Sequence, residues 1–217
     1  MSGTVERMDS GSGSQQLSAA PTAPVAPPGP KPVPARRRIL DASYKLFAQR
    51  GIRDVGVDEL IENAGVARAT FYTHFRSKDD LVLAYLARLF EARSAAIEAA
   101  VRSGGEGPSA LLGIFDVFAE VFKPGVNDGS SFVHVLIEMG AEHPLGKASI
   151  DYLAQTRAQI AALAGDAGLR DTQEFATKCH LLIKGAVVSA AEGDWAAVQH
   201  ARTMAAPLIE QYRVSQS

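Results

Sequence analysis

The sequence predicts an all-α protein, and three observations support this prediction. After Pro34, apolar residues recur three and four positions apart, as Ile39, Ala42 and Leu46 do in "ARRRILDASYKLFAQRG", which is the spacing of a helix with one buried face. No segment alternates apolar and polar residues as a strand does. Joints that contain glycine or proline, such as "SGGEGP" and "GDAGLRD", separate the helical segments.

Residues 1–34 differ in composition from the rest of the chain. They are rich in Ser, Gly, Ala, Gln and Pro, and they contain no aromatic residue. The stretch "APTAPVAPPGPKPVP" cannot form a helix or a central strand, because proline lacks an N–H donor and fixes φ. We expect a disordered tail with polyproline character. A plain solvated tail is the simpler interpretation, and a site for a proline-binding partner is the alternative.

The remaining elements follow in order along the chain. The first helix runs from about Ala35 to Arg50, and Gly51 ends it. Ser77 starts a long helix, with Asp80 three residues later as a weak capping box. Pro207 should kink or split the last helix. The other helices are expected over Asp58–Ala64, Ala67–Phe75, Lys78–Ser103, Pro108–Phe122, Ser130–Glu142, Leu145–Ala164, Thr172–Glu192 and Trp195–Val214.

The stretch "AGVARATFYTHF" predicts a helix-turn-helix. Gly65 can take the positive φ of a tight turn, and small Ala64 lies where the two helices cross. On the next helix Phe71 and Phe75 are four residues apart, so they share the buried face. The residues off that face are short or can form hydrogen bonds, which suits a helix that enters the major groove of DNA. They are Ala67, Arg68, Thr70, Tyr72, Thr73 and His74.

Basic residues flank this helix-turn-helix. Lys78 begins the long helix, where free N–H groups and an amine suit a backbone phosphate. Arg36 and Arg37 belong to a run of three arginines that is either a solvated helix start or a contact to phosphate or the minor groove. We favour the contact because a readout helix lies nearby in the chain. His74 is likewise either packed or groove-facing, and we favour the groove.

The segment "RRRILDASYKLFAQRGIRDVGVDELIENAGVARATFYTHFRSKDDLVLAYL" resembles the N-terminal DNA-binding domain of TetR-type transcriptional regulators. The motifs "LFAQRG", "AGVARATFYTHF" and "SKDDL" carry the resemblance at these spacings, over roughly Arg36 to Leu86. It implies that Tyr72 and Lys78 contact phosphate, and that the other exposed residues of the readout helix face bases or backbone. Two positions depart from the family pattern. Gly56 stands where Thr or Ser usually caps the second helix, and Ile61 stands where Ala is usual.

The resemblance also implies a domain organisation. Residues 35–81 would form a three-helix DNA-binding domain, and residues 82–217 a helical domain with a ligand pocket and a dimer interface. For the pocket we look for apolar walls with a few polar groups. The candidates are Tyr85, Leu89, Phe115, Phe118, Phe122, His134, Ile137, Glu138 and Tyr152. An aromatic stripe of this kind is also what a plain core requires.

His134 and Glu138 allow a second interpretation, because residues four apart share a helix face. They could bind a metal with the nearby Glu142 and His143. The simpler interpretation is a hydrogen-bonded pair and a helix terminus before Pro144. No metal and no cofactor is predicted.

The last two helices carry small residues that permit close packing, as expected for a four-helix interface across a two-fold axis. An intramolecular core is the alternative, and we favour the homodimer because the family and palindromic sites both need one. The predicted interface residues are Leu182, Ala186, Ser189, Ala190, Ala197, Ala201 and Ala205.

The composition and the motifs of the chain limit the classes of function that it can have. The chain has 217 residues, of which 47% are apolar and 21% charged, with a net charge of −2. Its single cysteine, Cys179, permits no internal disulfide, and no apolar run is long enough to cross a bilayer. We therefore expect a cytoplasmic protein without membrane contact. No phosphate loop, dinucleotide turn or catalytic grouping is found. Cys179 and His180 are neighbours whose side chains point about 100° apart on a helix, so no enzyme is predicted.

The sequence thus favours a ligand-responsive transcriptional regulator. It would be a repressor that binds double-stranded DNA at a palindromic operator as a homodimer, and a small hydrophobic effector would release it. Activation by the same parts stays open. The alternative is a DNA-binding architectural or division-related protein of the same fold that is controlled by a protein partner.

Overall fold

Helices make up nearly all of the chain that the structure describes, as the sequence predicts. The structure, a computed structural model, describes residue 3, residues 33–121 and residues 132–214. The predicted tail therefore lies almost wholly outside the described residues, as does Phe122. None of the helices in the described ranges is long and apolar enough to cross a membrane.

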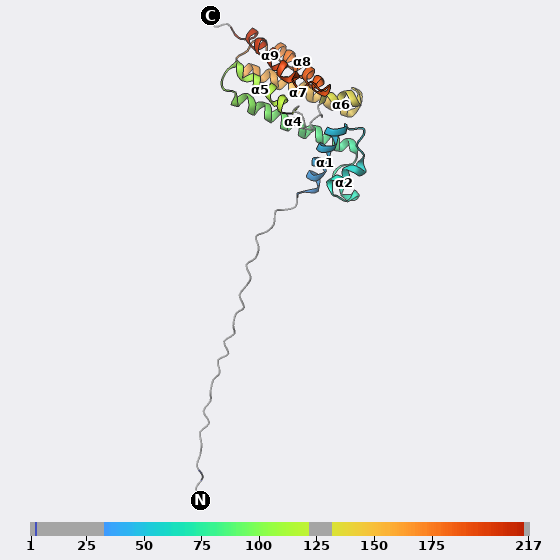
Figure 1. Cartoon of the computed structure of the whole chain (residues 1–217). Helices are drawn as coiled ribbons and strands as arrows, with labels where there is room; N and C mark the ends of the chain where they lie inside the picture. The colour runs from blue at the N-terminus through green and yellow to red at the C-terminus, as the bar shows by residue number, and fades with distance from the viewer. Residues whose placement is uncertain (1–2, 4–32, 122–131, 215–217) are drawn as a thin grey trace. The chain divides into compact units, whose positions relative to one another are not determined.

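The N-terminal helices lie close to their expected positions (Figure 1). The first two helices end at glycines with positive φ, Gly51 at 77° and Gly65 at 59°. Ser77 caps the long helix as predicted, because its side chain accepts a hydrogen bond from the Asp80 amide at 3.1 Å. The elements are α1 (Ala35–Arg50), α2 (Val57–Ala64), α3 (Arg68–His74) and α4 (Lys78–Ser103).

The C-terminal helices differ from the prediction in three places. The expected helix over Pro108–Phe122 begins as a 3-10 turn and becomes α-helical at Gly113. The helix expected from Ser130 to Glu142 ends earlier, because Gly140 takes a φ of 85°. Pro207 does not split the last helix, which continues on both sides of it. The elements are η1 (Pro108–Leu112), α5 (Gly113–Val121), α6 (Phe132–Met139), α7 (Pro144–Asp166), α8 (Thr172–Ala191) and α9 (Ala197–Gln211).

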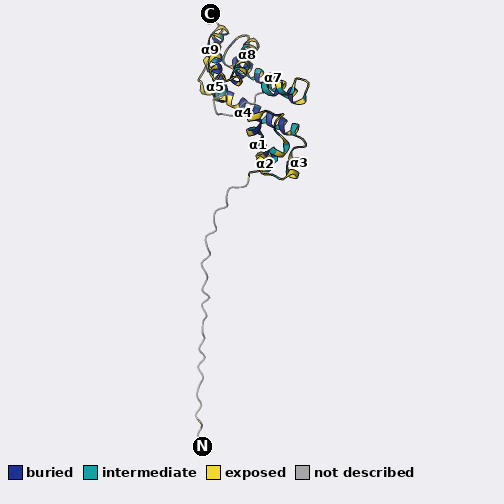
Figure 2. Cartoon of the chain, turned by 45° about the vertical axis from the view of Figure 1, so that its right-hand side comes forward, coloured by how far each residue is buried: buried dark blue, intermediate teal, exposed yellow. Residues whose placement is uncertain are grey.

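Two hydrophobic clusters form the core, and α4 contributes to both of them. In the first, the first half of α4 packs against α1, α2 and α3, and Tyr85 lies with its ring centroid 4.6 Å from that of Tyr44 and 5.4 Å from that of Phe47. This cluster also takes in Phe132 of α6 and Leu145 of α7. In the second, Ile97 of α4 packs with η1, α5, α7, α8 and α9. Figure 2 shows the buried faces of these helices turned towards one another.

The joint between α6 and α7 brings the backbone of Gly140 close to the first turn of α7. Gly146, on the first turn of α7, is buried, and a Cβ placed there would lie 1.8 Å from the carbonyl oxygen of Gly140. His143 caps the same helix, because its Nδ1 accepts a hydrogen bond from the Leu145 amide at 3.2 Å. The helix terminus before Pro144 that the sequence suggested is therefore confirmed.

We predict that Gly146→Ala destabilises the protein by about 1–3 kcal/mol, because the new methyl group meets backbone atoms that cannot move independently. Gly165→Ala on the same helix is the control, since its Cβ would meet only the Thr172 methyl at 3.9 Å. That control should be neutral or more stable by up to about 1 kcal/mol, as helix propensity requires. Urea unfolding followed by circular dichroism measures both, and equal stability of the two variants would contradict the prediction.

Candidate DNA-binding surface and ligand cavity

The helix-turn-helix has the geometry that the sequence predicts. Gly65 takes the left-handed conformation between α2 and α3, and its amide donates to the carbonyl of Glu62 at 3.0 Å. Arg38 of α1 closes the turn from outside, because its Nη1 donates to the Gly65 carbonyl at 2.9 Å. One arginine of the basic run therefore fixes the turn. The other two, Arg36 and Arg37, remain exposed.

α3 has one buried and one exposed face. Phe71 and Phe75 are at most 2% exposed and anchor the helix in the N-terminal core, as predicted. Thr70 is half-buried at the edge of that face. The other predicted contact residues are exposed, namely Ala67, Arg68, Tyr72, Thr73 and His74. They form a surface of short and hydrogen-bonding side chains, which we call the α3 face.

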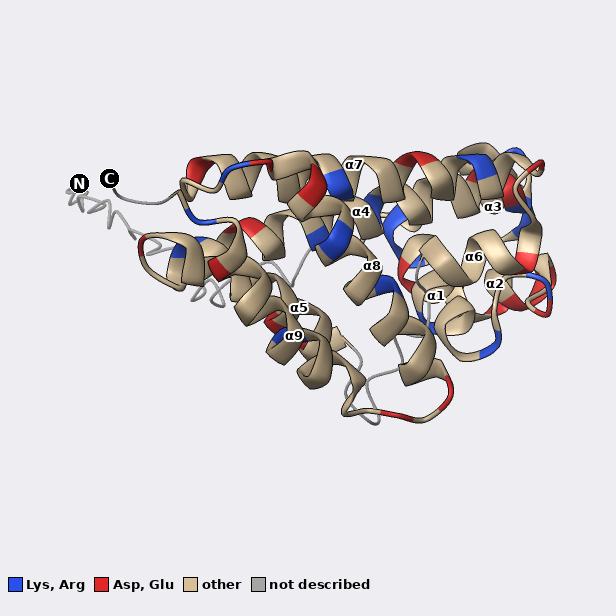
Figure 3. Ribbon diagram, turned by 90° about the horizontal axis from the view of Figure 1, so that it is seen from above, with Lys and Arg blue, Asp and Glu red and all other residues tan. Residues whose placement is uncertain are grey.

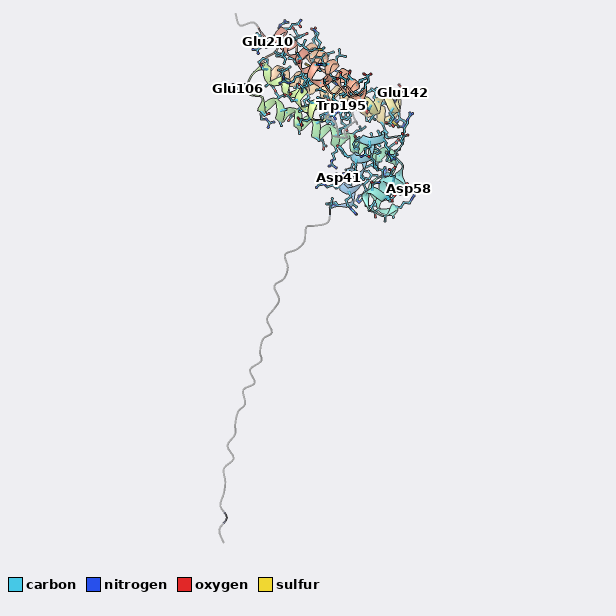
Figure 4. All side chains as sticks on the ribbon, in the orientation of Figure 1. Asp41, Asp58, Glu106, Glu142, Trp195 and Glu210 are labelled. Atoms are coloured by element: carbon cyan, nitrogen blue, oxygen red, sulfur yellow. The ribbon has the colours of Figure 1, made fainter. Side chains whose placement is uncertain are left out.

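Several side chains of the α3 face have local partners. Arg68 forms an ion pair with Asp58 of α2, and its guanidinium lies 5.9 Å from the ring centroid of Tyr72. Both members of the ion pair are largely exposed, so the pair contributes little stability and can exchange partners. Thr73 donates from Oγ1 to the carbonyl of Ala69 at 2.9 Å, which orients its methyl group. Asp58 is labelled in Figure 4.

Basic residues surround the α3 face. The guanidinium of Arg36 lies 5.3 Å from the ring centroid of Phe75, and that of Arg37 lies 3.8 Å from a carboxylate oxygen of Asp41. Lys78 is half-buried, and its Nζ donates to the carbonyl of Arg53 at 3.3 Å. Burial lowers the pKa of Lys78, although nearby carboxylates, Glu138 first, act in the opposite direction. Figure 3 shows basic and acidic residues mixed around α2 and α3.

A narrow cavity of about 20 Å³, partly open to solvent, lies between α4, α5, α6, α7 and α8. Apolar side chains form much of its wall, and polar and basic groups form the rest. Its lining residues are Arg93, Phe118, Phe132, Val133, Leu153, Thr156, His180, Ile183, Lys184 and Val187.

Of the predicted pocket residues, Phe118 lines this cavity and the other described ones lie elsewhere. Three are at most 4% exposed and belong to the core: Tyr85, Leu89 and Phe115. Tyr152 stacks between Phe90 and Phe132, with centroids 5.1 and 5.2 Å away. His134 of α6 is half-buried outside the lining. Phe122 lies outside the described residues.

Two residues of α6 correct the prediction. Ile137 is 71% exposed, so it forms no wall of an enclosed pocket. Glu138 points at the loop after α1, where its carboxylate accepts hydrogen bonds from the amides of Ile52, at 3.1 Å, and Arg53. The carboxylate therefore holds the α1–α2 loop. The helical period predicts that His134 and Glu138 share a face of α6, but it does not predict which neighbouring element that face contacts.

Sequence reasoning missed the basic side chains of the cavity. Arg93, Lys184 and His180 sit on helices that also carry many exposed charges, and a cation on such a helix usually indicates a solvated face. In the sequence His180 stands out only as the neighbour of Cys179. Burial raises the pKa of the Cys179 thiol to about 12, so this thiol is not a reactive thiolate. No sequence signal distinguishes the buried histidine and arginine from solvated ones.

The outer faces of α8 and α9 form a shallow groove. The predicted interface residues Leu182, Ala186, Ser189, Ala197 and Ala201 line it, together with Leu181, Gly185, Asp194, His200 and Met204. Ala190 and Ala205 lie beneath it, at most 2% exposed, in the core between the two helices. Leu181 and Met204 are 58% and 59% exposed, and Trp195 in the α8–α9 loop is 50% exposed (Figure 4).

Comparisons with known proteins agree with this geometry. The model of the family described as bacterial regulatory proteins, tetR family, matches residues 39–85, which run from α1 into α4. The HTH-type transcriptional regulator Rv1255c of Mycobacterium tuberculosis is 44% identical over 54 residues, which are 25% of this chain and 27% of that protein. The HTH-type transcriptional activator FasR of Mycolicibacterium smegmatis is 31% identical over 88 residues, which are 41% of this chain and 40% of that protein.

These alignments span less than half the length of the curated relatives. A similarity of fold extends further. The structure of SCO4454, a TetR-family transcriptional regulator from Streptomyces coelicolor, matches with a TM-score of 0.75 at 23% identity, covering 83% of this chain and 96% of that one. The helix-turn-helix therefore matches that of bacterial regulatory proteins of the tetR family, and the remaining helices share the fold of a TetR-family transcriptional regulator.

Proposed function

We propose that the protein is a ligand-responsive transcriptional repressor that binds a palindromic DNA operator as a homodimer. The α3 face carries the proposal. Its backbone is anchored by Phe71 and Phe75, and its outward side chains are short enough for close approach to base edges. The exposed Arg36 and Arg37 supply positive charge beside it for backbone phosphates. FasR is named an activator, so the sign of regulation is the part of the proposal that a reporter assay must test.

The homodimer would form through the groove on α8 and α9. Leu181 and Met204 expose large apolar side chains there, and alanines lie at its floor, so a second copy of the same face could approach closely. A two-fold axis would then place the two α3 helices about 34 Å apart, which is one turn of DNA. A selection of random duplexes should accordingly return a palindrome with half-sites about 10 base pairs apart.

The effector would be a small, largely apolar molecule that enters the cavity. α6 offers a physical connection from the cavity to DNA binding. Phe132 and Val133 in its first turn line the cavity, and Glu138 in its second turn holds the α1–α2 loop. A ligand that displaces the first turn would move the carboxylate from the amides of Ile52 and Arg53. It would thereby favour a different position of the helix-turn-helix, provided that it binds the two states with different affinity.

We predict that Tyr72→Ala lowers affinity for all DNA sequences by about tenfold, because the hydroxyl and ring would serve a phosphate contact. Tyr72→Phe should show the part of the loss that belongs to the hydroxyl. Thr70→Ala and His74→Ala should instead change preference at particular base pairs by about 1–3 kcal/mol.

Fluorescence anisotropy with the selected operator and single-base variants measures these effects. Thr177→Ala on α8 is the control, because Thr177 is an exposed helical threonine that donates to the carbonyl four residues earlier, as Thr73 does. Unchanged affinity of Tyr72→Ala at moderate salt would mean that α3 is not docked as proposed.

We also predict that Glu138→Gln speeds hydrogen exchange of the Ile52 and Arg53 amides about fivefold or more, since a charged acceptor is replaced by a neutral one. The same variant should respond less to the effector in operator release. Glu142→Gln is the matched control, because the Glu142 side chain is 95% exposed beyond the end of α6. If exchange at the two amides accelerates while the effector response stays intact, α6 holds the loop but does not carry the signal.

A further inference from the structure

The start of α1 and the middle of α4 border a hollow on the surface of the N-terminal helices. It has a volume of about 460 Å³ and is open to solvent. Among the described residues its lining contains three arginines and no aspartate or glutamate. The hollow therefore concentrates positive charge, although the chain as a whole has a net charge of −2. Its lining residues are Pro34, Arg36, Arg37, Leu40 and Arg88.

Arg88 of α4 is oriented by two contacts with α1. Its Nη1 donates to a carboxylate oxygen of Asp41 at 2.7 Å, and its guanidinium lies 5.0 Å from the ring centroid of Tyr44. The side chain of Arg88 is still 42% exposed. A guanidinium has five N–H donors, so the bond to Asp41 leaves others for a second acceptor. An oriented and accessible guanidinium of this kind suits the paired oxygens of a phosphate.

The arginines of the hollow outnumber the carboxylate that they contact. Asp41 accepts from Arg88, and its other oxygen lies 3.8 Å from Nε of Arg37. The first turn of α1 contains no acidic residue. Three arginines and one carboxylate leave an excess of two positive charges. The Asp41 side chain is 48% exposed (Figure 4), and exposed ion pairs are weak, so its arginines can exchange it for another anion.

The hollow adjoins the α3 face through the first turn of α1. Arg36 lines the hollow, and its guanidinium lies 5.3 Å from the ring centroid of Phe75, the residue that follows α3. Arg38 in the same turn donates to the carbonyl of Gly65, in the turn that precedes α3. This part of α1 therefore contacts the chain on both sides of α3. An anion with several charges that lies beside α3 would be the DNA itself.

We infer that the hollow binds the phosphate backbone of the DNA whose groove receives α3, and that Arg88 exchanges Asp41 for a phosphate. This inference rests on the proposed function, because it extends the same DNA-binding surface from α3 onto α4. A phosphate contact carries no base information. Arg88 would therefore strengthen binding to every sequence, and Asp41 would compete with the phosphate for the same guanidinium.

The first test is Arg88→Gln in the full chain, measured by fluorescence anisotropy over a range of salt concentrations. Affinity for the selected operator and for an unrelated duplex should fall by the same factor, about fivefold, because the lost contact is independent of sequence. The dependence of log affinity on log salt should become less steep by about one per protomer, since fewer counterions are released. Arg88→Lys should restore that steepness, because it keeps the charge.

Arg202→Gln is the matched control. Arg202 of α9 has a side chain that is 38% exposed, and it pairs with Asp116 of α5 at 2.9 Å, much as Arg88 pairs with Asp41. Its loss should leave DNA affinity and salt dependence unchanged. A loss of affinity in Arg202→Gln equal to that in Arg88→Gln would contradict a local phosphate contact.

Asp41→Asn distinguishes a DNA contact from a structural tie between α1 and α4. If Arg88 binds phosphate, removal of the competing carboxylate should raise DNA affinity about threefold or more, since the local positive charge increases. If Arg88 only ties the two helices together, Asp41→Asn should lower affinity as Arg88→Gln does, and this result would overturn the inference. Circular dichroism confirms that each variant is folded.

Tyr72→Ala in the same assay separates this inference from the proposed function. Affinity that falls in Tyr72→Ala and stays unchanged in Arg88→Gln would contradict the phosphate contact and support the docking of α3. An unaltered chain that binds no duplex would contradict the proposed function and the inference with it. A hexaglutamate peptide tests the other kind of occupant. Peptide binding that Arg88→Gln abolishes, with DNA affinity unchanged, would assign the hollow to an acidic protein segment and overturn the inference.

Discussion

The continuity of α4 is the constraint on which the rest of the structure depends. This helix of 26 residues gives its first half, Leu81 to Leu89, to the N-terminal core and its second half, at Ile97, to the C-terminal core. An uninterrupted helix spans about 1.5 Å per residue and bends little without a proline or a bulge. α4 therefore joins the helix-turn-helix to the remaining helices more rigidly than a flexible linker would, because both halves of the helix are packed in a core.

Arg93 lies on α4 between these two sets of buried residues, and this position explains why a polar cavity can exist there. Leu89, the last buried α4 residue of the first cluster, and Ile97, the first of the second, lie about two turns apart, with Arg93 between them. The aromatic rings of Phe118 and Phe132 cover the guanidinium from α5 and α6.

Much of the fold could be predicted from the sequence, because glycine, serine and helical periodicity act locally. Gly65 and Ser77 mark the ends of helices through their own backbone and side-chain geometry, and Phe71 with Phe75 identifies the inner face of α3. The cavity could not be predicted in the same way. Periodicity predicts that a helix has an apolar face, but not which neighbour covers it. Phe115 and Phe118 therefore look alike in the sequence, and both belong to the core, although Phe118 also lines the cavity.

Glu138 shows more clearly than the predicted apolar pocket residues what could not be predicted from the sequence. A carboxylate that accepts from two amides more than eighty residues away in the sequence depends on the tertiary arrangement, and no local rule anticipates it. Its place on α6 has a mechanical consequence. The helix has only eight residues, about 12 Å, so its cavity end and its loop end cannot move independently unless the helix itself unwinds. Unwinding would break backbone hydrogen bonds of the helix and remove the buried Phe132 and Val135 from the core. Under the proposed function, a displacement of α6 at the cavity would therefore reach the α1–α2 loop through movement of the whole helix.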